Sequence, residues 1–493
     1  MSTLYSEKDL DDFYDNIDNL MDKVNKKKLE EVEPTISEIK NVNSIIMDFI
    51  KLNKRKIYGG VALEYFLQDK NAEENIYQEN AFPDIDFYSA DPIGDLIKLC
   101  NDLNDKGFKH VRGREAIHKE SYSVYVNNRH YCNISYVPKN IYNKIQFKQI
   151  KDFIIVHPHF LLIDYLRVLT DPIISYLRLK EKNAFGRFYL IQKYFSLPYV
   201  NKPFEFDFDK TSEKTTKEIL NTVLDFTKEK DSMVHCGFLA YNYYLEESKM
   251  LTKRQNTKFK TIDIPYYEIV STNYKEDTLN LINNLKEKFT SEEIKVQENY
   301  PFSQYLGYSA TITYNDILIC VIYDNYNRCI PFKKYNNHFV GSFNYVILNA
   351  LSSLMKYRTE DDESSKNIQY MFISHLVELR KFYFKLHKKT IFDNTPFEDF
   401  CLDYKGQTLS PEKERQLIGE ARKKKNKPFM FSYEPSLKKD TKESIEIKYT
   451  FLNTSGNIIN NSKRSKLFSN NNEEENIELI ENSIEDEENN EDI

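Results

Sequence analysis

The chain has 493 residues, of which 40% are hydrophobic, so it can bury two or three separate cores. Its six cysteines form no CxxC pair, so the sequence indicates neither a zinc site nor a disulfide framework, which fits a reducing compartment. The acidic N-terminal residues lack the apolar core of a signal peptide, and no apolar run approaches the roughly 18 residues of a membrane helix. We therefore expect a protein with no membrane partner.

The formal charge of −7 is distributed unevenly along the chain. Residues 470–493 contain eleven acidic residues and no lysine or arginine, so the rest of the chain is mildly basic. We predict that this segment is a disordered, solvated tail, because so acidic a segment buries too little apolar surface to fold. The alternative is that it competes with nucleic acid for a basic groove.

In chain order, we first predict a helical N-terminal segment at residues 1–34. Residues 44–67 then read SIIMDFIKLNKRKIYGGVALEYFL. Their apolar spacing indicates an amphipathic helix, a short turn at glycine and a second helix. Residues 221–245 repeat this pattern as NTVLDFTKEKDSMVHCGFLAYNYYL, with Gly237 aligned to Gly60.

The same order of elements continues in both halves of the chain. Each half next contains a short β-rich run and a helix, then a hairpin around a polar turn, then apolar helices. The matching segments are 83–108 and 265–289, 121–138 and 308–325, and 159–196 and 343–387. We therefore predict an α+β fold built by tandem duplication of one domain. The expected boundaries are 1–34 for the helical N-terminal segment, 35–200 for the first copy, 201–390 for the second copy, 391–469 for a less regular C-terminal segment and 470–493 for the acidic tail.

The two copies differ where two aspartates interrupt an apolar run of the first. Residues 81–89 read AFPDIDFYS, with Asp84 and Asp86 where the second copy has Tyr266 and Glu268. Residues i and i+2 of a strand point to one face, so the two carboxylates lie about 7 Å apart along one edge. A cation beside them relieves their repulsion, and hard oxygen ligands select Mg²⁺ or Mn²⁺. Because the second copy has lost most of this charge, the architecture does not require it.

Gly59 and Gly60 precede the predicted helix VALEYFL. Glycines let a backbone approach a phosphate closely, and a helix N-terminus offers unpaired N–H groups. A phosphate-binding turn followed by a strand with two aspartates is the order of parts in a two-metal phosphoryl-transfer site. The glycine pair and the aspartate pair are weak signals separately, and they support each other in this order.

The segments KIYGGVALEYFL and PDIDFYS and the hairpin ending YCNISYVP resemble the nucleotidyltransferase fold shared by DNA polymerase β and the poly(A) polymerases. The second, degenerate copy and the helical segment 157–195 are similar to the poly(A) polymerase catalytic subunits of poxviruses and related large DNA viruses. This resemblance covers roughly residues 35–430, and its sharp motifs lie in 58–137.

The resemblance implies a template-independent polynucleotide adenylyltransferase that adds a poly(A) tail to the 3′ end of viral mRNA. ATP is then the substrate, Asp84 and Asp86 hold Mg²⁺ or Mn²⁺, and Gly59 and Gly60 accept the triphosphate. The RNA 3′ end is the other substrate, and the family implies either a homodimer or a separate processivity subunit. It also implies a location in the host cytoplasm, at the viral factory, or in the virion.

The chain departs from the family pattern at one position. The third carboxylate of the family falls on the later strand, where this chain has Asn133, which offers an oxygen but no charge. Three possibilities remain open: the site works with two carboxylates, Glu120 or another acid substitutes, or catalysis is impaired. We favour retained activity because both glycines and both aspartates are present.

Basic side chains that follow the first hairpin are candidates for contact with the triphosphate or the RNA backbone. We select Arg178, Lys180 and Lys182 as nucleotide-binding candidates. The run RKKKNK at 422–427 fits a solvated surface, a localisation signal or an RNA contact. The alternative functions are another RNA nucleotidyltransferase, of the oligoadenylate or tRNA-end type, and a catalytically inactive RNA-binding protein.

Overall fold

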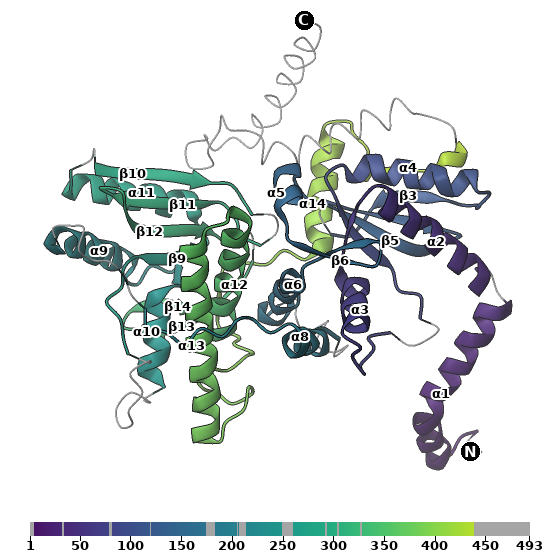
Figure 1. Ribbon diagram of the computed structural model, residues 1–493, viewed down its shortest axis with the longest axis horizontal. Helices are drawn as coiled ribbons and strands as arrows, with labels where there is room; N and C mark the ends of the chain where they lie inside the picture. Colours follow the sequence, from purple (N-terminus) through teal and green to yellow (C-terminus); the bar gives the residue numbers. More distant parts are fainter. Residues whose placement is uncertain are drawn as a thin grey trace, which may run out of the picture. The chain divides into compact units, whose positions relative to one another are not determined.

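The structure is a computed structural model that describes residues 4–31, 34–77, 81–118, 120–173, 183–204, 206, 213–248, 260–290, 293–302, 305–325 and 328–437 (Figure 1). The described residues form two compact units. The first unit takes them from Met1–Tyr136, Phe147–Ile155 and Ile418–Tyr449, and the second from Val137–Gln146 and Val156–Leu417. The acidic tail expected at 470–493 lies outside the described residues. In the part of the chain that is described, no helix is both long enough and apolar enough to cross a bilayer.

The first unit is built on an eight-stranded sheet with the order β16-β3-β4-β5-β2-β1-β7-β6. Its strands are β1 (Lys56–Tyr58), β2 (Ile85–Ser89), β3 (Arg112–Glu115), β4 (Ser121–Val126), β5 (Arg129–Tyr136), β6 (Phe147–Ile150), β7 (Phe153–Val156) and β16 (Ser432–Tyr433). Its helices are α1 (Glu7–Glu31), α2 (Ile36–Leu52), α3 (Gly59–Asp69), α4 (Pro92–Asp105), the second half of α14 (Pro411–Lys424) and the 3₁₀ helix η3 (Pro435–Leu437).

Helices α2 and α4 pack on this sheet because their apolar residues recur every three or four positions. The buried residues of α2 are Ile39, Val42, Ile46, Phe49 and Ile50. The side chain of Thr35 accepts a hydrogen bond from the backbone N–H of Glu38, which is the sequence pattern of a capped helix start. Figure 1 shows α4 lying beside β3, and α4 also contacts β4 and β5.

The second unit contains another eight-stranded sheet, with the order β10-β11-β12-β9-β8-β14-β13-β15. Its strands are β8 (Met233–His235), β9 (Tyr267–Ser271), β10 (Ile294–Asn299), β11 (Ser309–Tyr314), β12 (Ile317–Asp324), β13 (Ile330–Tyr335), β14 (His338–Gly341) and β15 (Tyr404–Lys405). Its helices are α5 (Lys139–Lys144), α6 (Pro158–Thr170), α8 (Asn183–Tyr194), α9 (Glu213–Thr227), α10 (Phe238–Glu247), α11 (Tyr274–Lys288), α12 (Phe343–Glu360) and α13 (Glu363–His387).

The two sheets share one topology, which confirms the predicted duplication. The run β3-β4-β5-β2-β1-β7-β6 corresponds strand for strand to β10-β11-β12-β9-β8-β14-β13. In both sheets the central strand pairs in parallel with the second strand of the hairpin, as β2 with β5 and β9 with β12. Both hairpins also carry a register shift at the same place, between Val124 and Tyr125 and between Ile312 and Thr313. A bulge repeated at one position is a feature of a common ancestor rather than of two unrelated sheets.

The strand register corrects one residue of the sequence alignment. Tyr58 is the partner of Asp86 across β1 and β2, and the backbone N–H of Cys236 donates to the carbonyl of Glu268. Tyr58 and Cys236 therefore occupy equivalent positions. The residue after Tyr58 is Gly59, which lies against Asp86, and the residue after Cys236 is Gly237, which lies against Glu268. Gly59 and not Gly60 is thus the counterpart of Gly237. The alignment was wrong by one residue because spacing alone does not show where a strand ends and its turn begins.

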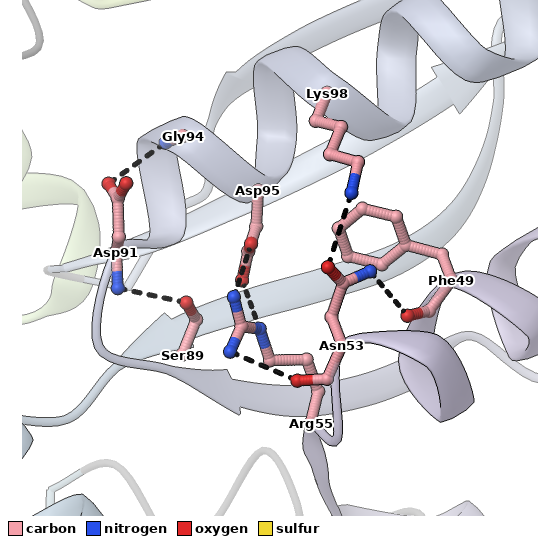
Figure 2. Close-up of polar contacts among 8 residues, drawn as sticks. All are labelled: Phe49, Asn53, Arg55, Ser89, Asp91, Gly94, Asp95 and Lys98. Carbon is pink, nitrogen blue, oxygen red and sulfur yellow. Dashed lines mark hydrogen bonds and ion pairs between the residues drawn. The ribbon is translucent and has the colours of Figure 1, made fainter.

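A partly buried polar network fixes the start of α4 in the first unit (Figure 2). The guanidinium of Arg55 donates to both oxygens of Asp95, at 2.6 and 2.7 Å. The Ser89 hydroxyl accepts from the backbone N–H of Asp91, whose own carboxylate accepts from the N–H of Gly94. Each buried polar group therefore has a partner, which holds α4 in place at the C-terminal end of β2.

The second unit repeats this network with different residues. The Ser271 hydroxyl accepts from the backbone N–H of Asn273 and donates to Asp277. Lys230 lies 3.1 Å from the Asp277 carboxylate and takes the part that Arg55 has in the first unit. Both copies have thus kept an ion pair at this place, Arg55 with Asp95 and Lys230 with Asp277. The residues at the opposite ends of β2 and its counterpart β9 have diverged.

Residues from the far end of the chain complete the first sheet. Strand β16 pairs with β3, and Phe431 next to it is fully buried. The Arg422 guanidinium donates to both oxygens of Glu115, at 2.9 and 3.0 Å. Part of the expected irregular segment 391–469 is therefore an integral element of the first unit.

Candidate active site

Strand β2 and the residue directly before it place the two aspartates of the first copy on one face of the sheet. Ile85 and Phe87 are buried at 5% and 0% exposure, so the alternate residues Asp84 and Asp86 point to the opposite face. Asp86 has Tyr58 as its partner on β1 and Asn133 as its partner on β5. The third-carboxylate position predicted from the sequence is therefore the direct neighbour of the aspartate pair.

The side-chain amide of Asn133 joins the two carboxylates. Its Nδ2 donates to Oδ2 of Asp84 at 3.0 Å and to Oδ1 of Asp86 at 2.9 Å. Carboxylates only accept hydrogen bonds, so the nitrogen of the amide has to face them. Its Oδ1 accepts from the Ser123 hydroxyl at 2.7 Å and from Nε2 of His130 at 2.9 Å. Both carboxylates thus converge on a single nitrogen atom.

Ser123 and His130 are site residues that the sequence analysis missed. A regular hairpin around the turn at Asn127 and Asn128 places Ser123 opposite Cys132, on the other face from Asn133. The register shift between Val124 and Tyr125 moves Ser123 opposite Asn133 instead. His130 lies on the same side, with its Nδ1 3.8 Å from Oδ2 of Asp84. No sequence signal marks this bulge, and its repetition in the second copy is visible only in the strand register.

The turn before α3 is shaped around Asp86. Gly59 has a φ of +75°, which is accessible to glycine and costly for other residues. A Cβ atom built on Gly59 lies only 2.6 Å from Oδ2 of Asp86. The positive φ and the close Cβ contact both require glycine at position 59, so the backbone at the start of the helix runs directly beside the Asp86 carboxylate. The next residue, Gly60, is buried in the first turn of α3.

Known protein families and structures match this arrangement. A family model described as poly(A) polymerase catalytic subunit matches residues 44–175. A second model, described as the C-terminal part of the putative poly(A) polymerase catalytic subunit of APMV, matches residues 210–468. The putative poly(A) polymerase catalytic subunit of Acanthamoeba polyphaga mimivirus is 34% identical in an alignment of 469 residues that covers 88% of this chain and 79% of the relative.

The chain belongs to the family of poly(A) polymerase catalytic subunits.

More distant members agree with this assignment. The putative poly(A) polymerase catalytic subunit of African swine fever virus strain Badajoz 1971 is 31% identical over 172 residues, which are 34% of this chain and 36% of the relative. The crystal structure of the Megavirus polyadenylate synthase superposes with a TM-score of 0.82 at 29% identity, covering 92% of this chain and 91% of that chain. The enzyme is a polynucleotide adenylyltransferase, as the sequence predicted.

In this polymerase we expect Gly59→Ala to lower kcat/KM for ATP by about 10²-fold, because the new methyl group displaces the Asp86 carboxylate by a large fraction of an ångström. Gly107→Ala is a matched control in the same unit, since Gly107 also has a positive φ, of +88°, but a Cβ there has open space. Steady-state kinetics and urea unfolding of both variants separate the two effects. Equal activity in the two variants would show that the contact does not position Asp86.

The structure describes only some of the basic residues that the sequence suggested for contact with nucleotide or RNA. Arg178, Lys180 and Lys182 lie outside the described residues, so their assignment to the nucleotide stays a prediction. In the run 422–427, Arg422 is tied to Glu115, and the Lys423 ammonium lies 5.1 Å from the centre of the Phe429 ring. These two residues of the run therefore contribute to the fold of the C-terminal segment.

In the second copy of the polymerase, the glycine turn and the strand beside it carry different residues. Glu268 occupies the place of Asp86, and a Cβ on Gly237 lies 2.7 Å from its Oε2. Glu268 is buried at 5% exposure, and this burial raises the pKa of its carboxyl to about 7. Val321 is its partner on β12, where the first copy has Asn133. A closed, apolar surrounding has therefore replaced the open cluster of polar groups.

Proposed function

We propose that this enzyme adds a poly(A) tail to the 3′ end of mRNA from ATP and without a template. The observation that carries the proposal is the convergence of Asp84 and Asp86 on one point, directly beside the glycine turn that starts α3. The second copy keeps the glycine but has lost this open pair, so one site per chain performs the chemistry.

The residues of the first copy fit a divalent cation. Two carboxylates converge on one atom, and the side chain of Asp84 is 43% exposed, so the pair is open to solvent and to substrate. Among the described residues there is no group of three or more His, Cys, Asp or Glu side chains arranged for a metal ion. Two carboxylates completed by substrate phosphates are a usual way to bind Mg²⁺. Asp84 and Asp86 would therefore hold Mg²⁺ or Mn²⁺ together with ATP.

The residues of the chain divide the work of nucleotidyl transfer between them. Divalent cations, when bound, neutralise the triphosphate and activate the 3′-hydroxyl of the RNA. Gly59 lets the N-terminus of α3 approach the phosphates, where its free N–H groups favour anions. Asn133 keeps the two carboxylates together, and Ser123 and His130 hold Asn133. The RNA 3′ oxygen attacks the α-phosphorus of ATP, and diphosphate leaves as the bond to it breaks.

The proposal includes the partners that such a reaction needs. The RNA 3′ end and ATP are the substrates, and a second copy or a separate processivity subunit completes the assembly. Because the relatives come from large DNA viruses, we place the reaction on viral transcripts, in the host cytoplasm or in the virion.

Primer extension with each of the four ribonucleotides separately tests the proposed function. We expect long extension of an oligo(A) RNA with ATP and Mg²⁺, none without a primer, and no preference for the end of a tRNA. Short products without primer, or selective repair of tRNA ends, would support the rival RNA nucleotidyltransferases. RNA binding with no incorporation in Mg²⁺ or Mn²⁺ would support an inactive RNA-binding protein and overturn the proposal.

Asn133→Asp tests the third-carboxylate position. We expect tighter Mn²⁺ binding, by about tenfold, because a third charge joins the pair, and unchanged or higher activity at low Mg²⁺. Without metal the variant should unfold at a lower urea concentration, since three carboxylates then repel one another. Electron paramagnetic resonance of free Mn²⁺ measures the binding independently of turnover. Weaker Mn²⁺ binding, or lost activity, would mean that position 133 is not the family's third carboxylate.

A further inference from the structure

Helix α1 carries an apolar stripe that the described residues of the first unit leave uncovered. Leu10, Phe13, Ile17, Leu20 and Val24 follow one another at spacings of three and four residues, the period of a coiled-coil seam. Leu10, Phe13, Leu20 and Val24 are exposed by 49–51%, and Ile17 is partly exposed. An uninterrupted seam of this kind on a helix surface marks a place where another helix packs.

The charges of α1 are separated along its length. Residues 7–22 contain seven acidic side chains and one lysine, whereas residues 23–28 contain four lysines and no acid. Two such helices side by side in parallel place like charges together. Two antiparallel helices place the acidic part of each beside the basic part of the other, which favours that arrangement.

We propose that α1 pairs with α1 of a second copy of this chain as an antiparallel two-stranded coiled coil. With Leu10, Ile17 and Val24 at a positions and Phe13 and Leu20 at d positions, the flanking g positions are Asp9, Asn16 and Lys23.

In an antiparallel pair centred on Asn16, Asp9 of each copy faces Lys23 of the other, so the charge pairing occurs twice. In a parallel pair, Lys23 instead faces Lys28 of the other helix, which is repulsive. The charges therefore specify both the partner and its direction.

A cross-linking experiment on the full chain tests this arrangement with two neutral substitutions. Asn16→Cys places thiols at the centre of the pair, and Asn19→Cys places them on the outer face of the same helix. The six native cysteines are buried, so they react slowly. We expect a short bismaleimide to give a covalent dimer with Asn16→Cys and at least tenfold less with Asn19→Cys.

Charge substitutions provide a second, independent readout by sedimentation velocity. Lys23→Asp should weaken self-association at least tenfold, whereas Lys26→Asp, with the same change of charge on the outer face, should leave it unchanged. The double variant Asp9→Lys/Lys23→Asp should restore association, even though Asp9 also caps its own helix by accepting from Ser6.

Three results would overturn the proposal. The first is equal cross-linking at positions 16 and 19, and the second is an equal effect of Lys23→Asp and Lys26→Asp. The third is a monomeric wild-type chain at all concentrations, which would mean that the seam packs on its own chain or on a different protein. None of these readouts depends on RNA or ATP, so they are separate from the test of the proposed function.

Discussion

Asp86→Asn is expected to lower ATP incorporation by about 10³-fold or more while the protein stays folded. Asparagine has the shape of aspartate, so the close contact with Gly59 and the packing of β2 are kept. The charge is lost, however, and a cation shared with Asp84 then has one charged ligand in place of two. The metal-free protein should be as stable as the wild type or slightly more so, because one of two neighbouring negative charges is gone.

Single-turnover extension of an RNA primer measures this effect on chemistry directly. The matched control is Glu268→Gln, which removes the charge from the corresponding position of the second copy. That variant should extend the primer at the wild-type rate. If Asp86→Asn retained activity, or if both variants lost it equally, the chemistry would not lie at the aspartate pair.

The second large effect is expected on stability, for the same Glu268→Gln substitution. Burial raises the pKa of Glu268 to about 7 in the folded chain, from an ordinary value of 4.5. The folded state therefore holds this proton more tightly than the unfolded chain. The contribution of Glu268 to the free energy of unfolding is greatest below pH 4.5 and falls as the pH rises to about 7, by about 3 kcal/mol. Glutamine stays neutral throughout, so the variant should gain about this amount over the wild type at pH 8 and nothing at pH 4.

A probe that reports on the second unit alone is needed, because a chain of two units does not unfold in one step. Hydrogen exchange of β9 amides in urea, at pH 5 and pH 8, provides it after correction for the intrinsic exchange rate. The gain should appear in β9 and be absent from β2. Equal protection of wild type and variant at pH 8 would show that Glu268 is ionised at little cost.

Much of the architecture was readable from the sequence because it is periodic and occurs twice. The order of helix, glycine turn, helix, strand, helix and hairpin predicted both copies, and the alternation in PDIDFYS predicted that Asp84 and Asp86 share a face. These inferences needed only local pattern and the known geometry of strands. The position of Asn133 came instead from the resemblance to the nucleotidyltransferase family, whose third carboxylate falls there.

What the sequence did not reveal depends on single-residue offsets and on distant contacts. The counterpart of Gly237 was misplaced by one residue, and the bulge that brings Ser123 opposite Asn133 has no local signal. The direction of the Asn133 amide follows from its four neighbours, of which three lie on β2, β4 and β5 and the fourth, Asp84, directly precedes β2. Strand β16 has two residues in a segment without periodicity, so its pairing with β3 could be seen only in three dimensions.

That pairing has a consequence for synthesis on the ribosome. Strand β16, the last strand of the first sheet, is translated after nearly all of the second unit, so the nascent first unit leaves the exit tunnel with the edge of β3 uncovered. At about 5–20 residues per second, this edge stays open for tens of seconds. A fragment that ends before residue 411 should therefore aggregate through the open edge of β3.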